Sequence, residues 1–185
     1  GGVNYFALMS YYLMSPLNFL TVFLPSEWLR EFLMFSVVIK VACASMFMAI
    51  FLRSLFKKND FSLVIFGCSF GFCAFFMGYY WNTIWLDTVC ITPLVALGTV
   101  KLFTEGKFRL YIVSLALSLL TNYYIGLFAC IFVLLSFIAY NIVKWDGIKK
   151  FATNLLRTGI YSLIAIGLTA LFLLPAFFGL KNTNA

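Results

Sequence analysis

Histidine is absent from this chain, and charged residues are scarce. Histidine is the commonest metal ligand and the side chain that titrates nearest to neutral pH, so its absence excludes His-based metal sites, proton shuttles and Ser-His catalysis. Charged residues make up 10% of the 185 residues, against about 25% in ordinary globular domains. Hydrophobic residues reach 64%, and a soluble domain of this size, which buries about 70% of its surface, cannot hide them. A soluble enzyme, a disordered region and a disulfide scaffold are therefore excluded.

The cysteines and the net charge indicate neither a metal site nor nucleic-acid binding. No two of the five cysteines have C-x-x-C spacing, and in apolar stretches they are typical small buried hydrophobic residues. The net charge of +7 comes from basic residues that gather between the apolar blocks. This distribution indicates membrane orientation, so we expect no nucleic-acid partner. The cysteines are Cys43, Cys68, Cys73, Cys90 and Cys130.

Continuous apolar stretches predict an all-α fold, namely a polytopic transmembrane helical bundle. A spanning helix needs about 20 apolar residues, whereas the strands of a membrane barrel would alternate apolar and polar residues. The candidate spans are residues 32–52, 61–80, 84–103, 110–143 and 158–180.

The basic residues predict the orientation of these spans. Ten of the 13 Lys and Arg residues follow the first, third and fourth apolar blocks. Lys and Arg accumulate on the cytoplasmic side, so we place residues 1–30 and 81–87 on the extracytoplasmic side.

The block 110–143 is 34 residues long, which is too long for one ordinary span. Both of its ends are basic, so it must cross an even number of times, and we predict a helical hairpin. The polar interruption Thr121-Asn122-Tyr123-Tyr124 is the expected turn. The first arm, residues 110–120, is about 17 Å long at 1.5 Å per residue, shorter than the roughly 30 Å hydrocarbon core. The turn should therefore lie below the outer surface, and the chain should have about six crossings.

The first 30 residues predict two short interfacial helices, because Ser15-Pro16 divides the apolar stretch 5–24. Serine suits a helix cap and proline the first turn of a helix. Tyr5, Tyr11 and Tyr12 are typical of the membrane interface. A seventh crossing is the alternative.

The chain starts with Gly1-Gly2 rather than Met and ends just after an apolar block. We therefore expect a piece of a longer protein. Within it, residues 1–185 are part of one transmembrane domain, with an extracytoplasmic loop at 1–30 and transmembrane helices at 31–180.

Asp87 is the first candidate site residue, at the end of the polar and aromatic stretch that also contains Asn82 and Trp85. A carboxylate at the mouth of an apolar helix is unfavourable unless it is paired, hydrated or bound to a cation. It suits a catalytic base, a ligand for a divalent metal ion or a partner for a sugar hydroxyl. The alternative is a capping or hydrated boundary residue, with Trp81 and Trp85 as interface anchors.

Two further groups are candidates for substrate binding. Asn122, Tyr123 and Tyr124 offer an amide and two phenols at membrane depth, which suit phosphate oxygens or sugars; the alternative is a simple turn. Lys40 lies about eight residues inside the first span, where a charge costs about 3 kcal/mol or more unless satisfied. It suits a lipid phosphate, or a structural pairing with Asp87 or a backbone carbonyl.

A run of small residues in the second span predicts close helix packing. Gly67 and Gly71 are four residues apart, and Gly78 follows them. This spacing is common in membrane helices, so we assign it no other role.

Three sequence blocks resemble the YfhO family of bacterial membrane proteins, in order and spacing over nearly the whole chain. The first is Gly1-Gly2 followed by Ser10-Tyr11-Tyr12-Leu13-Met14-Ser15-Pro16-Leu17-Asn18. The second is Asn82 with Trp85-Leu86-Asp87 and Pro93-Leu94. The third is Thr121-Asn122-Tyr123-Tyr124-Ile125-Gly126.

The family is similar to the GT-C glycosyltransferases, which are membrane enzymes with polyprenyl-phosphate sugars as donors. The resemblance implies a GT-C-like bundle in the bacterial cell membrane that is an enzyme when part of the full-length protein. It also implies three partners: membrane lipid, the donor, and an envelope polymer such as lipoteichoic acid as acceptor. The loop acid usually taken as catalytic in such enzymes would lie upstream of Gly1, so the resemblance does not transfer that role to Asp87.

Two other classes remain open. A flippase for a lipid-linked sugar would use the same polar groups at membrane depth without chemistry. A non-catalytic subunit of envelope assembly would tolerate loss of Asp87 and Asn122. No internal repeat that would favour a transporter is evident.

Overall fold

A computed structural model describes residues 5–183, and this part of the chain contains helices and no strands, as predicted. Gly1-Gly2 and the side chain of Tyr11 lie outside the described part. In chain order the elements are α1 (Tyr5–Tyr12), η1 (Pro16–Phe23), η2 (Ser26–Trp28), α2 (Leu29–Phe56), α3 (Ser62–Gly71), α4 (Ala74–Gly78), α5 (Thr83–Glu105), α6 (Arg109–Thr121), α7 (Tyr123–Val143) and α8 (Ile148–Thr183).

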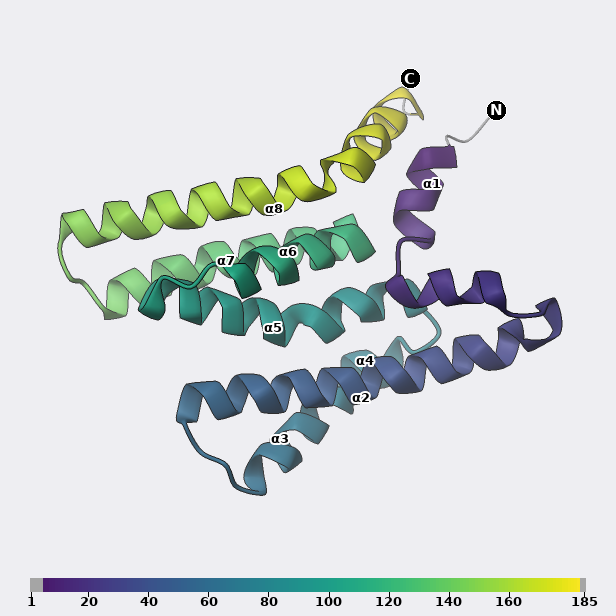
Figure 1. Cartoon of the computed structure of the whole chain (residues 1–185), viewed down its shortest axis with the longest axis horizontal. Coiled ribbons are helices and arrows are strands. Elements are labelled where there is room, and N and C mark those ends of the chain that lie inside the picture. The colour runs from purple at the N-terminus through teal and green to yellow at the C-terminus, as the bar shows by residue number, and fades with distance from the viewer. Residues whose placement is uncertain (1–4, 184–185) are drawn as a thin grey trace.

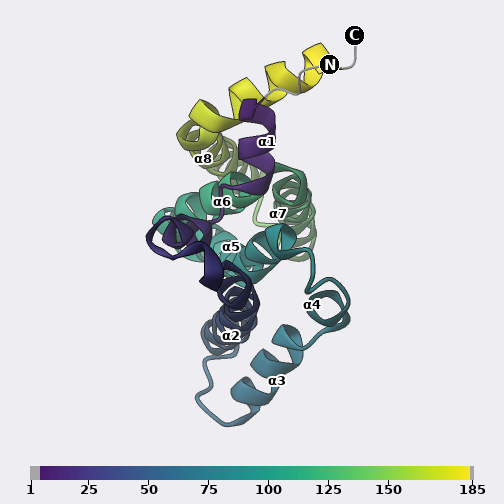
Figure 2. The same cartoon turned by 90° about the vertical axis from the view of Figure 1, so that its right-hand side faces the viewer.

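The helix α5 lies at the centre of an elongated row of helices. It packs against α2 on one side and against α6 and α7 on the other. The row continues outward with α3 beside α2 and with α8 beside α6, as the end-on view in Figure 2 shows. Residues on α5 therefore face two groups of helices, and both faces are available for buried interactions.

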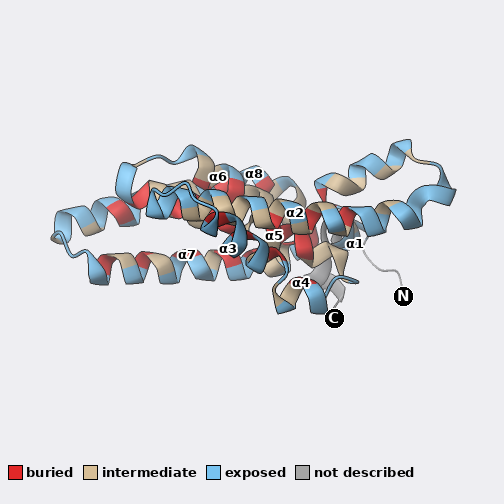
Figure 3. Cartoon of the chain, turned by 90° about the horizontal axis from the view of Figure 1, so that it is seen from below, coloured by how far each residue is buried: buried red, intermediate tan, exposed pale blue. Residues whose placement is uncertain are grey.

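Four of the described helices are long and apolar enough to cross a membrane. They are Ser26–Phe56, Thr83–Glu105, Tyr123–Val143 and Ile148–Phe178. The apolar helices Ser62–Gly78 and Arg109–Thr121 are shorter and lie in the sequence where the other two crossings were predicted. Large apolar side chains such as Ile142 and Leu171 are exposed, as expected where helices meet lipid rather than water. Exposed residues cover the outward faces of the helices (Figure 3).

The predicted hairpin between residues 110 and 143 is confirmed. The helix α6 ends at Thr121, α7 begins at Tyr123, and Asn122 joins them in an extended conformation. The side-chain oxygen of Asn122 accepts a hydrogen bond from the Ile125 amide at 3.0 Å and caps α7. The 13 residues of α6 span about 20 Å, so the first arm is short, as its sequence predicted.

The basic loops share one end of the bundle. The connections at residues 57–61, 106–108 and 144–147 all lie at the left in Figure 1, while the connections at 79–82 and at Asn122 lie at the right. This arrangement agrees with the predicted hairpin and with a common side for the basic residues. We call these two ends the basic end and the outer end.

The second predicted span differs from expectation. Residues 61–80 were predicted as one crossing helix, but the structure divides them into α3 and α4, with a break at Phe72 and Cys73. Gly71 ends α3 and Gly78 ends α4, and glycine is a poor helix former. The helix α8 also differs, because it begins ten residues before the predicted span. Lys149, Lys150 and Arg157 extend it beyond the apolar part.

The N-terminal stretch forms two short helices, as predicted. The helices α1 and η1 have eight residues each, and Pro16 occupies the first position of η1. The helix α1 packs on α8 and also touches α6 and α7. Ser15 differs from its expected role, because its side chain makes no capping hydrogen bond and is buried instead.

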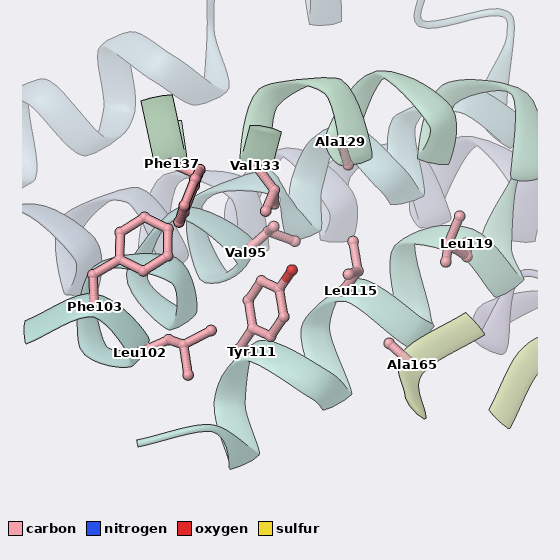
Figure 4. Packing of buried hydrophobic residues seen from close by; sticks show 10 residues of the cluster. All are labelled: Val95, Leu102, Phe103, Tyr111, Leu115, Leu119, Ala129, Val133, Phe137 and Ala165. Carbon is pink, nitrogen blue, oxygen red and sulfur yellow. The ribbon is translucent and has the colours of Figure 1, made fainter. Parts of the chain in front are cut away.

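The larger hydrophobic core lies between α5, α6, α7 and α8. Figure 4 shows Val95 of α5, Leu115 of α6 and Val133 of α7 pointing toward one another. Tyr111 of α6 is fully buried, and its hydroxyl lies 2.6 Å from the Ser162 hydroxyl of α8. A smaller core contains Ala44, Phe76, Leu86 and Cys90 and joins α2, α4 and α5.

Glycines set the closest helix contacts. A Cβ at Gly67 would lie 2.6 Å from the Ser45 carbonyl oxygen, and a Cβ at Gly71 would also overlap α2. The predicted small-residue face is therefore confirmed at these two positions, whereas Gly78 faces open space. Gly98 plays the same part between α5 and α6.

Replacing Gly98 with Ala should destabilise the bundle. Its Cβ would lie 2.7 Å from the Cα of Tyr111, so α5 and α6 must separate, at a cost of about 1–3 kcal/mol. Gly159→Ala is the matched control, because a Cβ there meets nothing within 4 Å and alanine favours a helix. Thermal unfolding in detergent measures both; equal midpoints for the two variants would contradict the close contact.

Candidate functional site

A buried ion pair joins α2 to α5 near the outer end. The Lys40 ammonium lies 2.9 Å from Oδ2 of Asp87, and the two side chains are 3% and 8% exposed. The ammonium also donates to the Thr83 carbonyl at 2.9 Å. Both structural pairings considered for Lys40 are thus present. Each charge makes the burial of the other tolerable, because an isolated charge at this depth would be strongly unfavourable.

Ser15 brings the N-terminal segment to this pair. It lies between α1 and η1, is 2% exposed, and its hydroxyl is close enough to the Asp87 carboxylate to interact with it. The hydroxyl meets the geometry of no hydrogen bond in the structure. Three separate segments of the chain therefore meet at Asp87.

A second polar group lies on the face of α5 that meets α6. The Thr88 hydroxyl is 3.0 Å from the Thr121 hydroxyl and 3.3 Å from the Ser118 carbonyl oxygen. Asn122 follows directly and is completely buried. Asp87 and Thr88 are consecutive residues of α5. The ion pair and the contact between Thr88 and Thr121, which we call the threonine group, therefore lie at the same height along this helix.

Three buried polar atoms at this level lack a hydrogen-bond partner within the described part of the chain. They are the hydroxyls of Ser15 and Ser118 and the amide nitrogen of Asn122. Buried polar groups are nearly always satisfied, so each of these atoms can take one further partner, such as water or a ligand oxygen. These atoms at the outer end of α5 could therefore bind a further polar group.

The remaining predicted site residues lie around this cluster rather than in it. Trp85 is partly buried and packs on Tyr79, with ring centroids 5.8 Å apart. Asn82 precedes α5 and makes no capping hydrogen bond with its side chain. Tyr124 is half exposed and contacts Phe128 of its own helix, while Tyr123 is partly buried.

An apolar pocket of about 570 Å³ adjoins the ion pair. Thr83 and Ile84 line it from α5, and Phe172 lines it from α8. Met14 and Phe19 come from the N-terminal segment. The Thr83 residue is shared, because its carbonyl accepts the hydrogen bond from Lys40 while the residue itself lines the pocket. The volume falls within the range of about 300–1,000 Å³ that is usual for small-molecule sites.

The comparison with known proteins agrees with this architecture. A family model described as bacterial membrane protein YfhO matches residues 1–185. The chain belongs to the YfhO family. No curated protein and no solved structure gives a match. With its four long apolar helices, this YfhO family chain is a multi-pass bacterial membrane protein.

The sequence suggests Asp87 of this YfhO family chain as a ligand for a divalent metal ion. Within residues 5–183 no three His, Cys, Asp or Glu residues are grouped as metal ligands. The Asp87 carboxylate, the expected ligand, is already paired with Lys40.

Sequence reasoning did not identify Ser15, Thr88 or Ser118 as parts of the site. Ser114, Ser118 and Thr121 lie at positions i, i+4 and i+7 of α6, so they form a polar stripe on one face of an apolar helix. That stripe is the signal that would have found the threonine group. Nothing in the spacing connects Ser15 with Asp87, because they lie on separate elements.

Breaking the ion pair on one side should destabilise the protein strongly. Lys40→Met or Asp87→Leu alone should lower the free energy of unfolding by about 3–5 kcal/mol, since each leaves one charge buried without its partner. The double variant Lys40→Met/Asp87→Leu should recover most of the loss. A double-mutant cycle by denaturant titration in detergent measures the coupling; additive losses would show that the two charges are independent.

Proposed function

We propose that this chain is part of a membrane glycosyltransferase acting on the extracytoplasmic side. Its donor is a sugar carried on polyprenyl phosphate, and its acceptor is lipoteichoic acid or another envelope polymer. The observation that carries the proposal is that Ser15 lies beside Asp87, while Thr88, the next residue of α5, pairs on the opposite face with Thr121, the neighbour of Asn122. Ser15, Asp87 and Asn122 each come from a different one of the three family-like blocks, and an apolar pocket adjoins the ion pair of Asp87.

The chemistry of these groups fits a lipid-linked donor. The apolar pocket suits a prenyl chain, and the Lys40 ammonium is a cation that can neutralise a phosphate within the membrane. The unpartnered Asn122 nitrogen is a donor for a sugar or phosphate oxygen. Asn82, Trp85, Tyr123 and Tyr124 supply amide and aromatic groups at the same end of the bundle.

Asp87 serves as the proposed general base. Its carboxylate is held by the Lys40 ammonium, so the donor phosphate must first draw that ammonium away. The carboxylate then takes the proton of the acceptor hydroxyl, whose oxygen attacks the anomeric carbon. The bond from that carbon to the phosphate oxygen breaks, and polyprenyl phosphate leaves with the electron pair.

Two observations favour other functions strongly enough to test. The pocket and the polar groups at membrane depth would equally serve a flippase that moves the lipid-linked sugar without chemistry. The burial and full pairing of Lys40 and Asp87 would suit a non-catalytic subunit in which the pair only holds helices together.

Transfer by the purified full-length protein decides among these functions. Reconstituted protein should move sugar from a polyprenyl-phosphate donor to lipoteichoic acid, as seen by mass spectrometry of the polymer. Asp87→Asn should lower the rate by about 10²- to 10⁴-fold, the usual contribution of a general base. Asp146→Asn is the control, because this exposed acid lies in the loop between α7 and α8 at the basic end.

The outcomes separate the alternatives. Movement of donor across the bilayer without sugar transfer would identify a flippase. Full activity of folded Asp87→Asn would remove Asp87 from catalysis. In cells, a deletion strain that carries the unaltered protein should regain the sugar on its lipoteichoic acid. The same strain with Asp87→Asn at matched expression should not.

A further inference from the structure

A second pocket lies at the basic end, between α2 and α3, and it is unrelated to the site around Asp87. Its volume is about 630 Å³. The two helices touch where Gly67 meets Ser45 and diverge toward the loop 57–61 (Figure 1). We call the pocket between them the wedge. The wedge opens at the end of the bundle where Lys58 lies.

The walls of the wedge are regular apolar stripes. On α2 the lining residues Met48, Leu52 and Phe56 are four residues apart and share one face. On α3 the residues Phe66 and Phe70 repeat the same spacing opposite them. Phe56 and Phe66 are about 60% exposed, so these walls are open to the lipid phase of the membrane.

The mouth of the wedge is positively charged. Lys58 lines it directly, and Arg53 and Lys57 lie close by in the chain. Asp60 is also there and accepts a hydrogen bond from the Ser62 hydroxyl, and Glu105, near Lys57, is paired with Lys107. The excess of basic residues favours an anionic partner, and the predicted cytoplasmic side is where anionic lipid headgroups concentrate.

We infer that the wedge between α2 and α3 binds one anionic phospholipid. An acyl chain lies against the two apolar stripes, and the phosphate lies at Lys58. An acyl chain matches the elongated apolar walls, and a headgroup with negative charge matches the mouth. The inference is independent of the proposed glycosyl transfer, since the wedge includes Lys58 of the loop after α2, whereas Asp87 lies near the start of α5.

Lipid binding by the full chain, purified in detergent, tests this inference. Native mass spectrometry would follow titration with phosphatidylglycerol and with phosphatidylcholine of the same acyl chains. We expect the unaltered protein to bind phosphatidylglycerol more tightly. Lys58→Gln should weaken that binding about five-fold, as expected for one basic residue near an anionic surface. Lys149→Gln, an exposed lysine of α8 that does not line the wedge, should leave it unchanged.

A filling variant separates the lipid from other occupants. Ser69 lies on the exposed wall of the wedge, and Ser69→Trp should reduce the binding of both lipids by occupying the space of the acyl chain. If another part of the protein fills the wedge, the unaltered chain will bind neither lipid there, and Ser69→Trp will only lower thermal stability. That result, equal binding of the two lipids, or equal behaviour of Lys58→Gln and Lys149→Gln would overturn the inference.

Discussion

The pairing of Lys40 with Asp87 is the constraint on which the outer half of the structure depends. Neither charge is tolerable alone at this depth, so α2 and α5 must be placed with one ammonium and one carboxylate in contact. The Thr83 carbonyl takes a second proton of the same ammonium and fixes the height of α2 against the first turn of α5. Hydrophobic packing alone would define the position of α2 along α5 less well, because apolar contacts are not directional.

Polar contacts on both faces of α5 connect the ion pair to the rest of the bundle. Asp87 is directed to α2 and the N-terminal segment, whereas Thr88 is directed to α6 and the turn at Asn122. A small movement of α5 therefore changes both polar groups together. The larger apolar core around Tyr111 holds α5, α6, α7 and α8 together and limits such movement.

Features that depend on one segment were predictable from the sequence, and features that depend on two were less so. The hairpin followed from the length of one apolar block and from the basic residues at its ends. The pairing of Lys40 was foreseen only as one of several partners, because the sequence cannot say which helix lies beside it. Ser15 was expected to cap a helix, and its burial beside Asp87 depends on the path of the entire N-terminal segment.

The break between α3 and α4 shows the same limit. Residues 61–80 are apolar enough for one span. Hydropathy alone does not predict that α3 ends at Gly71 and α4 ends at Gly78. Close contact at Gly67 and Gly71 holds α3 against α2, and tertiary packing of this kind overrides the tendency of an apolar stretch to continue as one helix. The glycines were visible in the sequence, but their effect depends on the neighbouring helix.

The packing of α1 on α8 has a consequence for synthesis in the cell. These helices come from opposite ends of the described chain, so α1 leaves the ribosome long before its partner exists. At about 5–20 residues per second, the wait is on the order of 10 s. During that time the residues of α1 that pack on α8 must be covered in another way. The outer end is thus the last part of this bundle to mature, even though its first residues are made first.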